Sequence, residues 1–464
     1  MSEIGTACSG FPNARSDVVV VRLARVGASS RIRARVRVSR SRGYSVTCVG
    51  GWSDLYSRSM KSRVVVSLLS VVFLAGCSTG GGQSLESPVA ATTSAPVSTS
   101  GRVDSSDAPM STSVEGDSSE TTVIGASSVS FDELSGRAAH TATTLLTGEV
   151  FVAGGCVSDG CSVATTETFI VAGDGASVVR GPDLSGPRDG HTAHALTNGN
   201  VVLIGGYAGE GEPPLSSVEL YEAPSGGIRR LGDLNQRRGG HASALLAGDR
   251  VLVVGGWIAR RTYTRSAEIV DVSSGSVTEA KPLPIALHAM DAVALADGRV
   301  LVTGGQLESG EGTDGAWIYD ESSNSWSETG LMIGRRFKHF SVLLSDGTVL
   351  VIGGTTDDRE ILATTEIYDP ASGAFTPGPD LVEPRYKLPG GAVVVDGDRV
   401  IVGGGGQTIE SIDLATQTST VLEDLGSQGS FATTTTIGDG GVLVLGGYDR
   451  SISLRRQALL IPNA

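Results

Sequence analysis

The segment Val201-Val-Leu-Ile-Gly-Gly206 decides the fold of this 464-residue chain. A short run that is apolar at every position indicates a strand buried on both faces, and here a glycine doublet ends the run. Six similar doublets occur, and the full set is Gly154-Gly155, Gly205-Gly206, Gly255-Gly256, Gly304-Gly305, Gly353-Gly354, Gly403-Gly404 and Gly446-Gly447. Their first glycines lie 51, 50, 49, 49, 50 and 43 residues apart. A β-rich repeat of about 50 residues predicts the blades of a β-propeller.

Each repeat carries signals for four short strands. A turn such as Asn198-Gly199 precedes the apolar run, and Asn-Gly suits a tight hairpin because both central residues adopt positive φ. A third strand carries Glu-x-Tyr-Asp or a relative, as in Glu366–Asp369. A fourth strand follows, in which Trp326 comes seven residues after Tyr319. We therefore expect an all-β ring of seven four-stranded antiparallel blades, with six or eight as alternatives.

The two ends of the repeat region predict that the ring closes. Residues 127–134 resemble a fourth strand that has no blade of its own. The last repeat ends at Gln457-Ala-Leu-Leu-Ile461, after a third strand. The N-terminal strand would complete the last blade and remove an exposed sheet edge.

The repeats resemble those of the kelch family, which carry a glycine doublet followed by a Tyr and a Trp. The resemblance covers the chain from about Ser130 onward, and the Tyr–Trp pair is complete only at Tyr319 and Trp326. In the competing WD40 propellers a Trp-Asp dipeptide ends a strand, and none does so here. The family resemblance implies the propeller fold and, for different members, either binding or catalysis.

Two enzyme types with kelch-type propellers provide a comparison. Galactose-oxidase-like copper enzymes need two His, a Tyr cross-linked to a Cys and an axial Tyr. Here Tyr386-Lys387 stands where a Tyr-His pair would be needed, and the later repeats contain no His. Kelch-type sugar mutarotases need only an acid/base pair near the axis, and no single pair stands out. We therefore expect no metal and no cofactor, and we assign no catalytic residue.

The first 126 residues resemble targeting and linker segments rather than a folded domain. Residues 1–59 hold ten Arg and no Lys, and the alternating segment Arg31–Arg37 has no evident pairing partner. Residues 60–76 have a basic head and an apolar core that is too short to span a membrane, which is typical of a signal peptide. Leu74-Ala-Gly-Cys77 resembles a bacterial lipobox, which implies lipidation of Cys77. We therefore expect residues 1–59 to be an upstream extension, although a basic nucleic-acid-binding arm is the alternative.

Residues 77–126 are rich in Ser, Thr and Pro and predict a flexible tether, with the propeller in residues 127–464. Residues 1–76 hold 12 Lys/Arg and 3 Asp/Glu, so that the remaining chain has a formal charge of −23 instead of −14. Such a charge repels phosphate backbones and argues against nucleic acid as a partner. We expect a monomer that is lipid-anchored in the cell envelope and faces out of the cytoplasm.

Two of the five cysteines fall within the propeller. Cys156 and Cys161 flank a four-residue loop directly after the first doublet. In an exported protein this spacing predicts a disulfide that clamps the loop. Two unlinked thiols are the alternative.

Four histidines recur in register. His140, His191, His241 and His339 each lie fourteen residues before a doublet and three residues after an Arg. The fourth repeat has His288 instead, and the last two repeats show neither residue of the pattern. Because a residue repeated in register is usually architectural, we expect these His and Arg side chains to bond strand ends and turns.

A binding site should break the symmetry of the ring. The loops after the doublets emerge on one face, and the third is basic and aromatic. Trp, Tyr and Arg are enriched in binding hot spots. The candidate ligand-binding residues are Trp257, Arg260, Arg261, Tyr263, Tyr448 and Arg450. The alternative is that the loop charges are solvated and pair with one another.

The sequence as a whole favours an envelope-anchored binding module that holds a protein or a glycan on its loop face. A carbohydrate-active enzyme of the mutarotase or epimerase type is the alternative function. A third possibility is a structural envelope protein with no soluble ligand.

Overall fold

The computed structural model describes residues 5–6, 18–25, 32–39, 127–130, 136–158, 161–172, 175–259, 262–396, 399–438, 440–455 and 457–462. They divide into two units, Met1–Ser113 and Val114–Ala464. The regular structure of both units is β-strand. Among the described residues there is no helix long and apolar enough to span a membrane.

The first unit contains one small antiparallel sheet. Its strands are β1 (Gly5–Thr6), β2 (Val18–Arg25) and β3 (Ile32–Ser39), in the order β1-β2-β3. The prediction that the segment Arg31–Arg37 has no pairing partner was wrong, because β2 pairs with β3 along its whole length. The predicted signal peptide, Cys77 and the tether lie outside the described residues and stay predictions.

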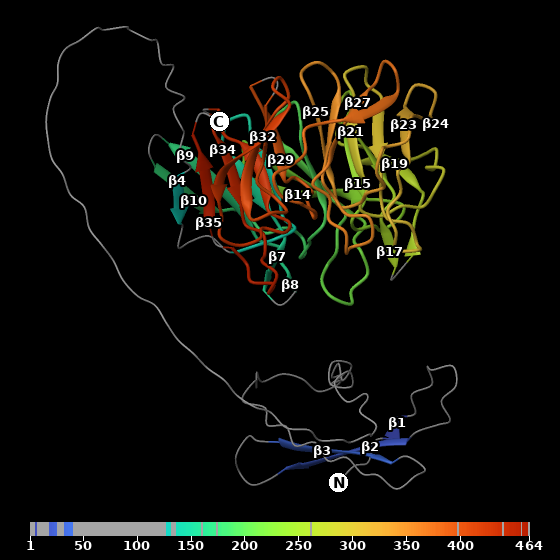
Figure 1. The fold of residues 1–464 in the computed structure, drawn as a ribbon, viewed down its shortest axis with the longest axis vertical. Helices are drawn as coiled ribbons and strands as arrows, with labels where there is room; N and C mark the ends of the chain where they lie inside the picture. Colours follow the sequence, from blue (N-terminus) through green and yellow to red (C-terminus); the bar gives the residue numbers. More distant parts are fainter. Residues whose placement is uncertain are drawn as a thin grey trace, which may run out of the picture. The chain divides into compact units, whose positions relative to one another are not determined.

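The second unit is a ring of seven antiparallel sheets, or blades, each with four strands (Figure 1). Blade 1 contains β5 (Thr141–Thr144), β6 (Val150–Ala153), β9 (Thr166–Ala172) and β10 (Gly175–Arg180). Blade 2 contains β11 (Thr192–Ala195), β12 (Val201–Ile204), β13 (Ser217–Glu222) and β14 (Gly227–Asp233). Blade 3 contains β15 (Ala242–Leu246), β16 (Arg250–Val254), β19 (Ala267–Asp271) and β20 (Ser276–Ala280).

The second half of the ring repeats this pattern. Blade 4 contains β21 (Asp291–Ala294), β22 (Val300–Thr303), β23 (Ala316–Asp320) and β24 (Ser325–Glu328). Blade 5 contains β25 (Phe340–Leu343), β26 (Val349–Ile352), β27 (Thr365–Asp369) and β28 (Ala374–Pro377). Blade 6 contains β29 (Ala392–Val395), β30 (Arg399–Val402), β31 (Thr408–Asp413) and β32 (Thr418–Asp424).

Blade 7 closes the ring, as the sequence predicted. It contains β33 (Thr433–Thr436), β34 (Val442–Leu445), β35 (Gln457–Ile461) and the N-terminal strand β4 (Ser127–Ser130). β4 pairs antiparallel with β35. The first strands of neighbouring blades contact one another in a closed circle, from β5 through β33 and back to β5, so these strands surround the axis.

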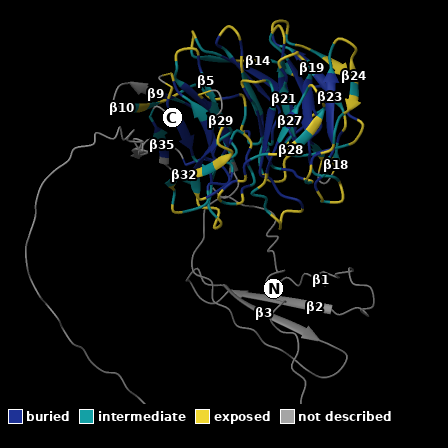
Figure 2. Ribbon diagram, turned by 45° about the horizontal axis from the view of Figure 1, so that its top comes forward, coloured by how far each residue is buried: buried dark blue, intermediate teal, exposed yellow. Residues whose placement is uncertain are grey.

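The core lies between the blades. The second strand of each blade is buried, and Figure 2 shows exposed residues in the turns and along outer strands such as β24 and β32. In β12 all four side chains are 0% exposed, which explains why this run is apolar at every position. Burying one such side chain stabilises the fold by about 1.5–3 kcal/mol. The predicted Tyr–Trp pair is formed: Tyr319 lies opposite Trp326, with ring centroids 4.9 Å apart.

Six of the seven doublets adopt positive φ at both glycines. Gly446, for example, has φ 63°, and a Cβ there would lie 2.2 Å from the carbonyl oxygen of Arg137. The sixth doublet is an exception, because neither Gly403 nor Gly404 has positive φ and the left-handed residue is Gly405. The shorter last spacing in the sequence follows this irregular blade.

Two further hairpins extend from the ring. They are formed by β7 (Cys156–Ser158) with β8 (Cys161–Ser162) and by β17 (Trp257–Ala259) with β18 (Thr262–Tyr263). Both follow a glycine doublet.

Candidate functional site

The linkers that lead into the blades are fixed by a repeated buried ion pair. An arginine near the end of the linker binds a glutamate on the third strand of the blade that follows. The pairs are Arg137–Glu167, Arg188–Glu219, Arg238–Glu268, Arg336–Glu366 and Arg385–Glu410. Each of these arginines is at most 1% exposed. A charge held this deeply needs its partner, so the pair fixes the linker rigidly on the blade.

Seven residues, one for each blade, adopt a left-handed conformation where the linker enters the first strand. We call them the axial ring: Ala139, Gly190, Gly240, Ala289, Lys338, Lys387 and Phe431, with φ between 53° and 59°. Ala139 donates its N–H to the carbonyl of Phe431 at 3.2 Å. Equivalent bonds of 2.9–3.3 Å join the other neighbours, with Leu388 as the donor to Lys338. Backbone hydrogen bonds therefore form a closed circle around the axis.

The axial ring lies at the same end of the blades as the loops that follow the doublets. The residue after a doublet pairs with the residue before a ring member, as Tyr207 does with Asp189 and Tyr448 with Ser430. We call this end of the propeller the doublet face. Side chains of the ring and of these loops therefore meet near the axis.

The axial ring breaks the symmetry of the propeller on one side. Four neighbouring members are Ala or Gly, and the other three are Lys338, Lys387 and Phe431. A left-handed conformation is uncommon for residues with a long or bulky side chain, and such residues gather at functional sites. The whole chain contains only four lysines, and two of them occupy equivalent positions in neighbouring blades.

An aromatic cluster covers the side of the axial ring that is formed by alanine and glycine. The Trp257 ring lies 5.4 Å from the His288 ring and 6.0 Å from the Tyr207 ring, and Tyr263 stacks on His288 at 5.3 Å. The Tyr207 hydroxyl and His288 Nε2 are 3.1 Å apart. A Cβ on Gly240 would lie 2.4 Å from His288 Nε2, so that only glycine fits beneath the cluster. Four side chains from three blades are thus fixed together.

Electrostatics keep this cluster neutral. Burial, and to a smaller extent the charge of Lys338, lower the pKa of His288 to about 4. Burial also raises the pKa of Tyr207, with a smaller contribution from Asp189. Both groups are therefore uncharged at neutral pH.

The other side of the ring is cationic. The Lys387 ammonium lies 4.8, 5.7 and 5.1 Å from the ring centroids of Tyr386, Phe431 and Tyr448, and it donates a 2.8 Å hydrogen bond to the Tyr448 hydroxyl. Burial lowers the pKa of Lys387, but the hydrogen bonds and charge interactions with Tyr448 and Tyr386 together outweigh it, so the net shift is upward. Within the described ranges, no carboxylate forms an ion pair with Lys387.

Lys338 has a different environment from Lys387. Its ammonium pairs with the Asp358 carboxylate and lies 5.1 Å from the centroid of the Phe337 ring. The Lys338 side chain is 18% exposed and that of Asp358 is 44% exposed. Of the two ring lysines, Lys387 therefore has the positive charge that is not balanced.

A family model described as the Kelch motif matches residues 336–382, which include one doublet, one buried Arg–Glu pair and Lys338. The glycine doublet recurs in all seven blades, and the buried Arg–Glu pair is found in five of them among the described residues. The domain is a kelch-repeat β-propeller. No curated protein matches the chain.

The kelch propeller brings some of the sequence-predicted site residues together and separates others. Trp257 and Tyr263 share the aromatic cluster, whereas Tyr448 contacts Lys387 in the cationic part. Arg450 is exposed, with its Nε 3.4 Å from the Gln428 side chain. Arg260 and Arg261 lie outside the described residues. Sequence reasoning missed Lys338, Lys387 and Phe431 as a group, although each of the two lysines follows a repeat arginine by two positions.

The repeated histidines of the kelch propeller join neighbouring blades, as expected of architectural residues. His191 Nε2 lies 2.9 Å from the Thr141 hydroxyl, and His241 Nε2 lies 3.0 Å from the Thr192 hydroxyl. The prediction that the sixth repeat lacks the arginine was wrong, because Arg385 is fully buried and binds Glu410 at 2.7 Å.

The predicted Cys156–Cys161 disulfide would lie in the hairpin of β7 and β8. The hairpin register places Cys156 opposite Ser162 and Cys161 opposite Ser158. The Cys156 side chain hydrogen-bonds to Asp189, whose pKa is raised by burial in spite of this bond. The side chain of Cys161 is outside the described residues, so that the disulfide stays a prediction.

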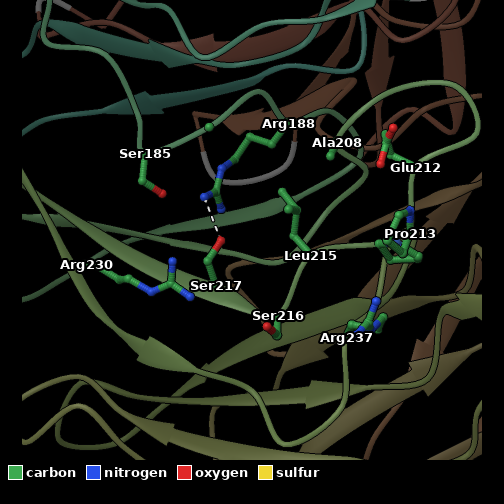
Figure 3. Close-up of a pocket in the computed structure, with 12 residues that line it drawn as sticks. Ser185, Arg188, Ala208, Glu212, Pro213, Leu215, Ser216, Ser217, Arg230 and Arg237 are labelled. Atoms are coloured by element: carbon green, nitrogen blue, oxygen red, sulfur yellow. Dashed lines mark hydrogen bonds between the residues drawn. The ribbon is translucent and has the colours of Figure 1, made fainter.

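A pocket of about 380 Å³ lies beside blade 2 on the doublet face (Figure 3). Its walls include Arg188, Arg230, Arg237 and Glu212, and Figure 3 shows Arg188 directed at Ser217. Arg188 is paired with Glu219, and Arg230 pairs with Asp233. Two of the three arginines that line the pocket are therefore already neutralised within the kelch propeller. Among the described residues, no group of three or more His, Cys, Asp or Glu side chains could hold a metal ion.

Proposed function

We propose that this kelch propeller is a binding module whose doublet face holds a partner protein near the axis. A kelch propeller fits a protein-interaction module in general. The observation that carries the proposal is the asymmetry of the axial ring, in which Lys338, Lys387 and Phe431 replace small residues. An architectural ring needs no long side chains at these positions, and four of its members have none.

The neighbouring aromatic cluster supports the same function. Trp257 and Tyr263 are partly exposed on the doublet face and are held by packing against His288. Rigid aromatic side chains contribute contact area at a low cost in conformational entropy. A partner would therefore meet a preformed surface.

Affinity capture tests the proposal. The full-length protein serves as bait for an envelope extract of its source organism, beside a W257A/Y263A variant and a K387Q variant. We expect a partner that the wild type retains and that both variants lose. The L146S variant is the matched control, because Leu146 is 77% exposed and lies in a turn at the opposite end of the blades. Equal retention by all four proteins would contradict a site on the doublet face.

Lipid anchoring in the cell envelope is a second part of the proposal. It rests on residues 60–77, where a basic head, an apolar core and a lipobox-like Leu74-Ala-Gly-Cys77 follow one another. Metabolic labelling with radioactive palmitate should label the wild type and a C156S control, and it should not label C77S. Persistent label on C77S would contradict the lipid anchor at Cys77.

A sugar-converting enzyme remains the second candidate function because of one residue. Asp291 lies on the innermost strand β21 and accepts a 2.6 Å hydrogen bond from the backbone N–H of Ser341. Burial raises its pKa to about 7, which suits a general acid or base. Polarimetry of aldose mutarotation with wild type and D291N tests this function. Equal rates for the two proteins would contradict it.

A further inference from the structure

Two neighbouring linkers share a pattern that the other linkers lack. Ile333-x-x-Arg336-Phe-Lys338 leads into blade 5, and Val382-x-x-Arg385-Tyr-Lys387 leads into blade 6. The corresponding residues before blades 2 and 3 are Ser185-x-x-Arg188-Asp-Gly190 and Asn235-x-x-Arg238-Gly-Gly240. An apolar residue and a lysine thus replace a polar residue and a glycine together, in two adjacent repeats. We call these two linkers the paired spokes.

The apolar residues of the paired spokes face solvent. Ile333 is 61% exposed and Val382 is 56% exposed, and both belong to the few large hydrophobic side chains of the described residues that are exposed. The architecture does not use these side chains, because each residue is held through its backbone. The N–H of Ile333 binds Glu366 at 2.7 Å, and that of Val382 binds Glu410 at 2.7 Å. Side chains exposed in this way are typical of an interaction surface.

The lysines lie at the axial ends of the same two spokes. Lys338 is balanced by Asp358, but Lys387 contacts three aromatic rings and a hydroxyl. These contacts stabilise the Lys387 ammonium but include no carboxylate, so a carboxylate placed beside it would form an ion pair in a partly desolvated site. Because residues 77–464 carry a formal charge of −23, an acidic partner would be repelled elsewhere on the surface. The two lysines would therefore attract an acidic partner and also determine where on the surface it binds.

We infer that the paired spokes bind a protein segment that carries carboxylate and aliphatic side chains together. Its carboxylates bind Lys387 and Lys338 near the axis, and its aliphatic side chains cover Val382 and Ile333 further out. The buried pairs Arg336–Glu366 and Arg385–Glu410 hold both spokes in place before binding, which reduces the entropy lost on association. This inference rests on the proposed function and states the chemistry of the partner.

Fluorescence anisotropy with labelled synthetic peptides tests it on the full-length protein. The probe is four repeats of Ser-Glu-Leu, and the matched peptides are four repeats of Ser-Gln-Leu and of Ser-Glu-Ser. We expect saturable binding of the first peptide only, and binding that weakens as salt shortens the range of the charge interaction. Absence of binding by the first peptide, or equal binding of all three, would overturn the inference.

Variants locate the site. K387Q should weaken the Ser-Glu-Leu peptide about tenfold, and K338Q should weaken it less because Asp358 already balances that charge. I333S and V382S should each weaken it by a factor of about three, since a small apolar contact is lost. K281Q is the matched control, because Lys281 is the third lysine of the described residues and lies outside the paired spokes. Melting temperatures equal to that of wild type exclude unfolding as the cause.

Two further outcomes separate this inference from others. Polygalacturonate carries carboxylates without aliphatic side chains, and if it competes as well as the Ser-Glu-Leu peptide, a glycan is the partner and the inference fails. If no peptide binds while the envelope extract still yields a partner that depends on the doublet face, the proposed function stands and only the paired-spoke inference fails.

Discussion

His140 Nε2 lies 2.8 Å from the hydroxyl Oγ1 of Thr433, although 293 positions of the chain separate the two residues. His140 directly precedes β5 of blade 1 and Thr433 begins β33 of blade 7, so that this contact joins the first and last repeats of the ring. Both side chains are buried. The bond is one of the side-chain interactions that close the propeller.

A double-mutant cycle should measure the strength of that closure. H140A leaves the Thr433 hydroxyl buried without this partner, which costs about 1–3 kcal/mol of the free energy of unfolding. T433V removes the hydroxyl and leaves a neutral imidazole. We expect a coupling energy of about 1 kcal/mol between the two changes, measured by urea denaturation. Strictly additive effects would show that the contact does not contribute to closure.

The buried ion pairs should matter far more than the exposed ones. E410Q removes the buried one of the two carboxylates that pair with the fully buried Arg385 and leaves only the partly exposed Glu383, so the free energy of unfolding should fall by about 3 kcal/mol. D396N breaks the exposed pair between Arg399 and Asp396 and should cost less than about 1 kcal/mol. The R385M/E410M double variant should be more stable than E410Q, because it leaves no buried charge. Chemical denaturation of the four proteins compares these costs, and equal losses for E410Q and D396N would refute this account.

The propeller should lose stability in mild acid. Burial, the largest cause, lowers the pKa of all six histidines, and it lowers those of His140, His241 and His339 to about 3. At a pH above 6.5, the pKa of histidine in the unfolded chain, neither the folded nor the unfolded protein binds these protons. As the pH falls from about 6.5 toward 3, the unfolded chain takes up protons that the folded protein does not, so the free energy of unfolding falls. Each such proton contributes about 1.4 kcal/mol per pH unit.

The pKa shift of Asp291 has the opposite effect on the pH dependence of stability. Because burial raises its folded pKa to about 7, it stabilises the fold most at low pH, and this contribution is lost as the pH rises from about 4 to 7. Burial also raises the pKa of Asp189, so two acids oppose six histidines and the net effect still favours unfolding in acid. Urea denaturation between pH 7.5 and 5 measures the slope, and H339N should reduce it. Stability that is constant over this range would contradict the histidine account.

Substitution by alanine should destabilise the propeller to different extents at two glycines of the doublets. Gly446 has φ 63°, and a Cβ there would meet the Arg137 backbone, so G446A should cost more than about 2 kcal/mol. Gly403 does not have positive φ, and a Cβ there would meet the side chains of Val444 and Thr434. Because side chains move more easily than backbone, G403A should cost less than G446A. Thermal melting of the two variants distinguishes them, and the reverse order would contradict the assignment of the irregular blade.

Much of this fold follows from local sequence. The buried run Val201–Ile204 and the pairing of Tyr319 with Trp326 were predictable, because each depends on residues close together in one repeat. Closure by β4 was predictable because the last repeat lacked a strand. The left-handed conformation of Gly405 was not predictable, because four consecutive glycines give no signal for which of them adopts positive φ.

The candidate site was only partly predictable. Trp257 and Tyr263 stood out by residue type, and they lie together because they belong to one hairpin. Their contacts with Tyr207 and His288 depend on the packing of separate blades. The left-handed conformation of Lys338 and Lys387 has no signature in residue type, and only alignment on Arg336 and Arg385 would have revealed their equivalence.

The pairing of β4 with β35 has a consequence for the order of assembly. The strand Ser127–Ser130 is synthesised before any blade, whereas its partner Gln457–Ile461 follows the first six blades in the chain. Bringing such distant segments together requires closing a very long loop, which is slow compared with forming the hairpins of each blade. During synthesis the strand Ser127–Ser130 therefore stays without its pairing strand until β35 has been made, and a chain truncated before β35 could not form this strand pair.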